Sequence, residues 1–152
     1  MTMVITDAKK QDIDGIMEIE RSSFSVPWGE SGMIFEIDSE DAYVPVLRDG
    51  GEILGFAVLH MFENEGELFN IAVKKEHRGK KAGKKLLISL IKFAERQRLE
   101  RIFLEVREST LPARGLYTKA GFRELGVRKN YYDHPKENAV MMVYDVREGK
   151  NR

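Results

Sequence analysis

The sequence predicts a single α/β domain: a mixed β-sheet of about seven strands, flanked by about four helices. The chain of 152 residues is long enough to build one hydrophobic core and too short for two domains. In its first half, short apolar runs joined by tight turns indicate an antiparallel meander. In its second half, an amphipathic helix followed by a strand indicates a parallel crossover.

The chain is expected to open with a strand at residues 3–6 and then a helix. Asp12 is the expected N-cap, because the apolar residues after it recur at helical spacing, at positions Ile13, Ile16 and Met17. Residues 24–28 should end this helix, since Pro27 disfavours helical geometry in the residue before it. A second short helix is expected around residues 33–37.

Three strands are then expected, at residues 43–47, 53–62 and 68–73. The first two flank Asp49-Gly50-Gly51, a strong hairpin signal. The second and third flank Asn64-Glu65-Gly66. Strands joined by turns this short pair antiparallel.

The second half begins with a helix whose apolar residues share one face, namely Leu86, Leu87, Leu90, Ile91 and Ala94. The elements expected after it are a strand at 102–106, a short helix around 116–119, and closing strands at about 123–131 and 139–146. The domain is expected to cover residues 1–146, with residues 147–152 as a polar tail.

Composition narrows the classes of partner and chemistry. The 25 basic and 25 acidic residues give a net charge of zero, so nothing global favours a nucleic acid or an anionic membrane. There is no cysteine, which excludes disulfides, thiolate zinc sites and a cysteine nucleophile. The three histidines lack paired ligand spacing, so no metal is expected. No apolar run approaches the ~20 residues of a membrane span, and a cytoplasmic monomer is expected.

Residues 74–85 form a basic loop ahead of the long helix. Seven of these twelve residues are Lys or Arg, and Glu76 is the only acidic one. A helix N-terminus already carries partial positive charge, so this cluster is unfavourable unless it meets an anion. Gly79 and Gly83 would let the backbone approach such a ligand. A phosphate-binding loop and a solvated lysine-rich turn are equally compatible with the residue types.

This loop and the strand before it resemble the acetyl-CoA motif of GNAT-superfamily N-acetyltransferases. The resemblance is carried by Asn70-Ile71-Ala72-Val73, by Arg78 to Lys84 and by Leu86-Leu87. It implies acetyl-CoA as co-substrate, with the strand along the pantetheine arm and the loop amides on the pyrophosphate. The implied cofactor residues are Ile71, Ala72, Val73, Arg78, Gly79, Lys80, Lys81, Ala82, Gly83 and Lys84. Lys81 stands where the family usually has glycine.

Glu105 and Tyr117 are the candidate catalytic residues. Taken alone, the pattern favours Glu105 as a strand-end glutamate paired with Arg107 or Arg101, and Tyr117 as a packing residue with a wet hydroxyl. Their surroundings resemble the RimI type of GNAT enzyme in the segments 104–109, 116–117, 121–122, 128–132 and 137–142. The resemblance implies Glu105 as the base for the attacking amine and Tyr117 as the acid for the leaving thiolate. Thr110 replaces an asparagine that contacts CoA in the family.

The acceptor side is expected at Phe24, Pro27, Trp28, Tyr131 and Tyr132, with Glu67 as the reserve base. Each aromatic residue here has a packing role as its alternative. The implied reaction is direct acetyl transfer to the N-terminal amine of a protein, with a ribosomal protein such as S18 as the acceptor that the RimI type suggests. Two alternatives keep the fold: a small amine, polyamine or lysine acceptor, and a non-catalytic acyl-CoA-binding module.

Overall fold

The computed structural model describes residues 2–79 and 81–147. The strands are β1 (Val4–Asp7), β2 (Ala42–Tyr43), β3 (Pro45–Asp49), β4 (Glu52–Phe62), β5 (Glu65–Val73), β6 (Arg101–Arg107), β7 (Arg123–Asp133) and β8 (Lys136–Asp145). The helices are α1 (Ile13–Ser23), α2 (Glu30–Asp38), α3 (Ala82–Arg96) and α4 (Leu111–Ala120), with 3-10 turns at Lys10–Asp12 and Lys75–His77.

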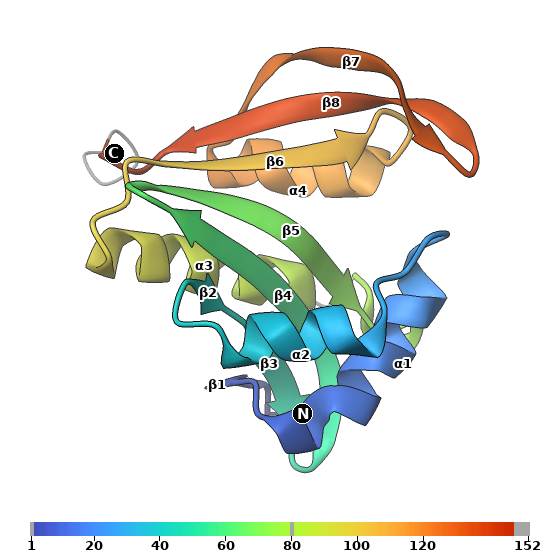
Figure 1. Cartoon of the computed structure of the whole chain (residues 1–152), viewed down its shortest axis with the longest axis vertical. Helices are drawn as coiled ribbons and strands as arrows, with labels where there is room; N and C mark the ends of the chain where they lie inside the picture. The colour runs from blue at the N-terminus through green and yellow to red at the C-terminus, as the bar shows by residue number, and fades with distance from the viewer. Residues whose placement is uncertain (1, 80, 148–152) are drawn as a thin grey trace.

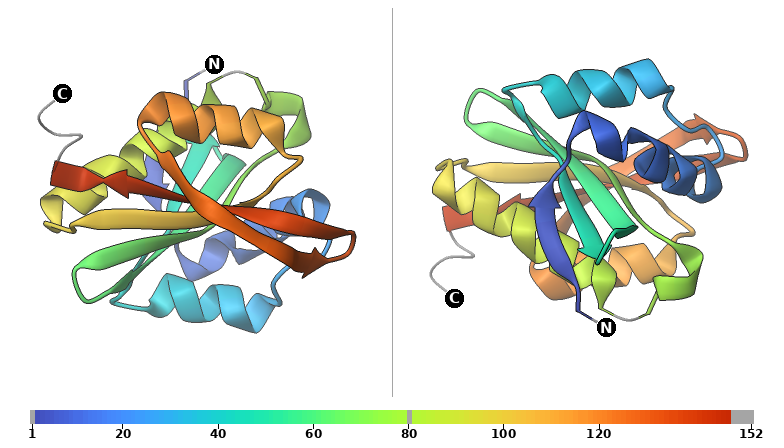
Figure 2. Two further views of the ribbon diagram at one scale, coloured as in Figure 1. Left: turned by 90° about the horizontal axis from the view of Figure 1, so that it is seen from above. Right: turned by 90° about the horizontal axis from the view of Figure 1, so that it is seen from below.

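The strands form one twisted mixed sheet in the order β1-β3-β4-β5-β6-β8-β7, with β2 also pairing β4 (Figures 1 and 2). Pairing is antiparallel except between β5 and β6, which the helix α3 connects. The mixed α/β domain predicted from the sequence is confirmed. Within the described residues the sheet has eight strands, because Pro45 lacks an N–H group and divides the expected strand 43–47 into β2 and β3.

The turns of the first half follow the sequence signals. Asp49 pairs with Glu52 across Gly50-Gly51, and Gly50 has φ of +60°, which glycine adopts without steric cost. The turn from β4 to β5 runs through Glu63, also at positive φ. The antiparallel meander β3-β4-β5 is therefore confirmed.

The two faces of the sheet carry separate cores. On one face α3 and α4 cover a cluster that includes Leu47, Leu86, Leu90 and Leu104. On the other, α1 and α2 cover a cluster that includes Ile16, Met33, Phe56 and Val58. Figure 2 shows the helices distributed over both faces.

Two helix starts differ in detail from expectation. Asp12 precedes α1, yet its side chain does not cap that helix; its carboxylate instead accepts from the Lys9 N–H and pairs with Arg48 at 2.9 Å. Helix α4 begins at Leu111 rather than near Leu116, with Pro112 in its first turn, where a missing N–H costs little. No helix among the described residues combines the length and apolarity needed to cross a bilayer. Most of the predicted tail, residues 148–152, lies outside the described residues.

Candidate functional site

The parallel strands β5 and β6 pair over only part of their length. Pairing runs from Glu65 opposite Arg101 to Leu68 opposite Leu104, and then stops. Beyond that point β5 stays paired with β4 as far as Val73, while β6 stays paired with β8 as far as Arg107. The two strands therefore diverge within the sheet, as Figure 1 shows.

A β-bulge lies at the point of divergence. In the β4–β5 pair, Leu59 is opposite Leu68 and Val58 is opposite Asn70, so Phe69 is an extra residue on β5. A bulge bends the strand that carries it and is common beside active sites. The bend turns the second half of β5 away from β6.

Beyond the bulge, Ile71 to Val73 have no strand partner on their β6 side. Backbone N–H and C=O groups on such an edge are available to an extended ligand that adds to the strand. These are the residues that the family resemblance assigns to the pantetheine arm. Glu105 is the first residue of β6 past the paired region, so one predicted catalytic group lies at the divergence.

The basic loop continues from the end of β5 into α3. Its backbone has positive φ at Gly79 (+78°) and Lys81 (+65°). Lys81 occupies the N-cap position of α3 without a side-chain cap, and the first turn has no acidic residue. The first N–H groups of a helix have no partner within the helix, so this end of α3 offers donors to an anion.

Several predicted loop residues have roles in packing as well. The Arg78 Nε donates to the Val73 carbonyl at 3.0 Å, so this side chain closes the loop onto β5. At Gly83 a Cβ would lie 3.2 Å from Leu116 of α4, and the glycine therefore permits close packing of α3 and α4. Ala82 is buried in the core and Lys84 is exposed. Lys80 lies outside the described residues.

Glu105 is a half-buried carboxylate whose ion-pair partner is Arg128 of β7, with the Nη1–Oε1 distance at 3.6 Å. The alternative partners Arg101 and Arg107 pair with other carboxylates. Hydrogen bonding to Glu105, followed by burial, raises the pKa of Tyr131. Desolvation and then the charge of Glu105 raise the pKa of Glu67. Glu105, Glu67 and Tyr131 are thus brought together.

Tyr117 is buried in the core at 5% exposure, and its ring packs against Phe122. Burial, followed by the neighbouring Tyr132, raises its pKa above that of a free tyrosine. Tyr132 is half-buried; burial and then the charge of Glu105 raise the pKa of Tyr132 to about 12. Tyr132 therefore interacts with both predicted catalytic residues. Tyr117 keeps its proton at neutral pH, as a proton donor must.

The predicted acceptor residues come from two places, the segment between α1 and α2 and strand β7. Trp28 packs edge-on against Phe69, the bulged residue, at 5.7 Å between ring centroids. Phe24 and Trp28 also pack against the core under α1 and α2, while Pro27 is exposed. Tyr131 and Tyr132 meet edge-on at 5.1 Å. The aromatic residues thus both pack and border the divergence.

Two irregular backbone segments orient the β6 and β7 residues. The register between β7 and β8 shifts from Arg128 to Tyr132, where the Asn130 N–H donates to the Asn138 side chain. After β6 the chain turns through Ser109, whose N–H donates to Glu137. Thr110 then forms the N-cap of α4, without a side-chain cap bond.

Glu20, Asn70 and Arg107 make contacts that the sequence reasoning did not predict. Glu20 is buried on α1, where it accepts from the Asn70 side chain. Its position could have been noticed, because Ile13, Ile16, Met17 and Glu20 fall on one helix face, and a charged residue on that face needs a partner. Asn70 gave no such signal, since the bulge changes which face its side chain takes.

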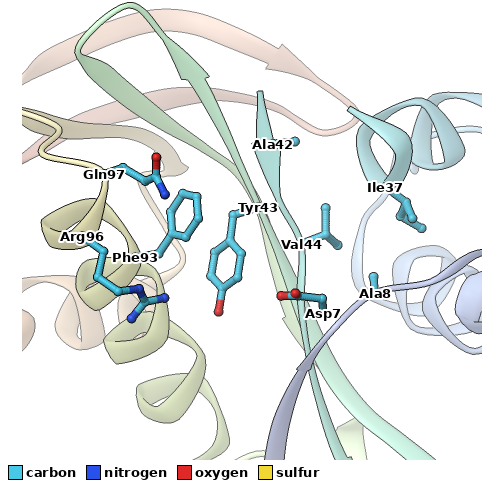
Figure 3. A pocket seen from close by; sticks show the side chains of 9 residues that line it. All are labelled: Asp7, Ala8, Ile37, Ala42, Tyr43, Val44, Phe93, Arg96 and Gln97. Carbon is cyan, nitrogen blue, oxygen red and sulfur yellow. The ribbon is translucent and has the colours of Figure 1, made fainter. Parts of the chain in front are cut away.

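A separate cavity lies away from these residues. It has a volume of about 340 Å³ and is lined by Tyr43, Phe93, Arg96, Gln97 and Asp7, among others (Figure 3). The rings of Tyr43 and Phe93 stack at 4.2 Å. None of the predicted site residues lines it, so we place the candidate site at the divergence of β5 and β6. The described residues contain no group of three His, Asp or Glu residues that could hold a metal ion.

Comparison with known proteins identifies the family. Residues 13–122 match the model of the acetyltransferase (GNAT) family. Two relatives are ribosomal protein bS18-alanine N-acetyltransferases. The Haemophilus influenzae enzyme is 37% identical, covering 92% of this chain and 97% of its own. The Escherichia coli K12 enzyme is 30% identical, covering 93% and 97%.

Solved structures of two proteins resemble this chain over most of its length. The crystal structure of the ribosomal-protein-S18-alanine N-acetyltransferase from Escherichia coli superposes with a TM-score of 0.89 at 29% identity, covering 95% of this chain and 94% of that one. The Ard1 structure from Thermoplasma volcanium has a TM-score of 0.87 at 22% identity, covering 95% and 98%. The second likeness concerns the fold alone.

Proposed function

The chain belongs to the acetyltransferase (GNAT) family and is an N-acetyltransferase, and from this premise we propose that it transfers acetyl from acetyl-CoA to the N-terminal amine of a protein, of the ribosomal-protein-alanine type. The observation that carries the proposal is the divergence of β5 and β6. It leaves the Ile71–Val73 edge unpaired and begins, on the other strand, at Glu105.

Acetyl-CoA fits the residues on the β5 side. An extended pantetheine arm can pair with the unpaired edge of Ile71 to Val73. Its pyrophosphate can accept from the first N–H groups of α3, where no acidic residue competes. Lys84 adds a cation on the first turn of α3. These contacts are made chiefly by the backbone, so Lys81 in place of glycine is compatible with them.

The proposed reaction is a direct transfer. Glu105, acting through a water molecule, takes a proton from the N-terminal ammonium; such assistance is typically worth about 10²–10⁴-fold. The amine then attacks the thioester carbon, whose oxygen is stabilised by the Val73 N–H. The amide bond forms, the carbon–sulfur bond breaks, and the sulfur takes the Tyr117 proton. The second proton that the nitrogen loses passes through water to the tyrosinate and restores Tyr117. Glu67 remains the reserve base, since its raised pKa also suits proton transfer.

A peptide acceptor is favoured over a small amine by the aromatic border of the site. Trp28, Tyr131 and Tyr132 come from two separate parts of the chain, and Tyr131 stays 47% exposed. An extended chain leading away from its amine would contact these rings. The two bacterial relatives, named for alanine acetylation of bS18, support the same acceptor class.

The proposal is tested by mass spectrometry of peptides incubated with acetyl-CoA. The panel contains peptides with free N-termini that differ in their first residue, including the N-terminus of ribosomal protein bS18. We expect acetylation confined to the α-amine, with alanine preferred at the first position. N-α-acetylated copies of the same peptides, each with one internal lysine, are the matched control for side-chain transfer.

Other outcomes would replace the acceptor or the activity. Acetylation of polyamines or of the control lysines, with no α-amine product, would move this chain to the small-amine or lysine class. Acetyl-CoA binding by calorimetry without product from any amine would identify a non-catalytic acyl-CoA-binding module.

A further inference from the structure

Residues 24–28, in the segment between α1 and α2, are attached to both of the diverging strands. We name residues 24–28 the strap. It follows the C-terminal end of α1 and leads into α2, on the same side of the molecule as the ends of β5 and β6 (Figure 1). Its contacts to the two strands are made by different residues and can be considered separately.

The attachment to β5 is buried. The side chain of Asn70 donates to one carboxyl oxygen of Glu20 at 2.7 Å, and the backbone N–H of Trp28 donates to the other at 2.9 Å. Glu20 is 1% exposed and Asn70 is 5% exposed. Asn70 follows the bulged Phe69 directly, so Glu20 joins the strap to β5 just past the divergence.

The attachment to β6 runs through Arg107. Its Nη2 donates to the Ser25 hydroxyl at 3.2 Å and to the His134 carbonyl at 3.2 Å, while its Nη1 donates to the Pro135 carbonyl at 2.8 Å. The same guanidinium lies 4.3 Å from the centre of the Tyr132 ring. Arg107 therefore joins the strap, the β7–β8 turn and an aromatic residue of the proposed acceptor site.

We propose that Glu20 and Arg107 are positioning residues that hold the strap across the two diverged strands and thereby set the place of the acceptor. The inference rests on the proposed function. Past the divergence β5 and β6 have no hydrogen bonds to each other, so the strap supplies a second connection between the strand proposed to hold acetyl-CoA and the strand that carries Glu105.

The first test replaces Glu20 by methionine, which keeps the length of the side chain and removes both acceptors. Trp28 is the only tryptophan, so quenching of the intrinsic fluorescence by acrylamide reports on the strap without any assay of activity. We expect faster quenching and a rise of about 10-fold or more in the KM of the acceptor peptide, since a hydrogen bond to a charged group is lost. The KM of acetyl-CoA should stay within about twofold of wild type, because Glu20 makes none of the proposed cofactor contacts.

The conservative variant Glu20→Gln provides the rescue. Its amide oxygen can accept from Trp28, and its amide nitrogen can donate to Asn70 if that side chain turns over. Quenching and acceptor KM should therefore lie between those of wild type and Glu20→Met. The matched control is Asp12→Leu, because Asp12 is another buried acid with a backbone and a side-chain donor. It should lose stability while leaving both readouts unchanged.

A second pair of variants tests the β6 attachment even if Glu20→Met does not fold. Arg107→Met should raise the acceptor KM, and Ser25→Ala should do so by a smaller factor, since it removes one exposed bond. Fluorescence quenching tests whether these residues hold the strap in place, and it does so whether or not a peptide is acetylated. A wild-type protein without N-terminal activity would therefore refute only the proposed function. Folded variants with wild-type quenching and wild-type acceptor KM would overturn the inference.

Discussion

The two sides of the site are built in different ways. On the β5 side, residues 71–73 and 81–84 belong to one stretch of the chain and present mainly backbone groups: an unpaired strand edge and the first turn of α3. On the β6 side, the arrangement depends on side chains from the strap, β6, β7 and the β7–β8 turn. These are joined by hydrogen bonds such as Arg107 to Ser25 and Asn130 to Asn138.

This difference determines how each side responds to substitution. A backbone-built surface keeps its donors when a side chain changes, provided that the backbone does not move. A surface built from side chains loses a specific contact with each replacement, and buried partners are left unsatisfied. We therefore expect the acetyl-CoA side to tolerate changes of residue and the acceptor side to be sensitive to them.

The largest effect is expected from Glu105→Gln. Turnover should fall by about 10²–10⁴-fold, because proton removal from the amine loses its base. Acetyl-CoA affinity, measured by calorimetry, should be nearly unchanged. Tyr117→Phe should lower turnover at the same chemical step.

The control for these variants is Glu124→Gln, which neutralises an exposed carboxylate paired with Arg114 and should retain wild-type turnover. If Glu105→Gln and Tyr117→Phe both kept full turnover, neither residue would belong to the mechanism. Another residue would then have to remove the proton from the attacking amine.

Gly55→Ala should be a substitution that the β5 side does not tolerate, because the added side chain displaces the backbone of β5. A Cβ on Gly55 would lie 2.8 Å from the Ala72 carbonyl oxygen and 3.2 Å from Leu86. Overpacking of this kind costs about 1–3 kcal/mol, which thermal unfolding would measure. Acetyl-CoA affinity should fall with it, since Ala72 and Val73 must shift. Gly32→Ala, where the added Cβ meets nothing within 4 Å, should show neither effect.

Lys81→Gly should show the tolerance of the β5 side, because it changes a side chain and relieves the backbone. Lys81 has φ of +65°, a conformation that costs a non-glycine residue about 1–2 kcal/mol. Glycine removes that cost but adds entropy to the unfolded chain, so a net gain of at most about 1 kcal/mol is expected in chemical denaturation. Acetyl-CoA affinity should change only slightly. Lys81→Ala separates the effect of losing the positive charge from the effect of relieving the backbone, because it removes the charge and keeps the strained conformation.

The smallest effect concerns the electrostatic repulsion between Glu67 and Glu105. Desolvation is the larger cause of the raised pKa of Glu67, and repulsion by Glu105 is the next. Glu105→Gln removes the negative neighbour, so the carboxyl group of Glu67 should ionise more easily and its pKa should fall toward 4.5. Carbon-13 NMR titration of the Glu67 carboxyl measures this directly. An unchanged or higher pKa would mean that the two carboxylates do not interact.

The same contrast explains which features could be predicted from the sequence. The basic loop and the Gly50-Gly51 turn were recognisable because their signals are local. Glu105 and Tyr117 were candidates through family resemblance, whereas the pairing of Glu105 with Arg128 depends on how β7 lies against β8. Simple alternation along β5 would put Leu68, Asn70 and Ala72 on one face. The bulge instead sends Leu68 toward the α3 core and Ala72 toward the α1 core, so the contact of Asn70 with Glu20 could not be read from the pattern.

Because of the bulge at Phe69, the opening of the sheet depends on the number of residues in β5. Beyond it, each residue of β5 still faces the same layer as its β4 partner, because the extra residue shifts the alternation along β5 by one position. Substituting Phe69 changes a side chain and leaves the count of residues as it is, and the strands should still diverge. Deleting Phe69 would shorten β5 by one link and let its second half run alongside β6. The opening on which the chemistry depends is thus encoded by an insertion, which only a deletion can undo.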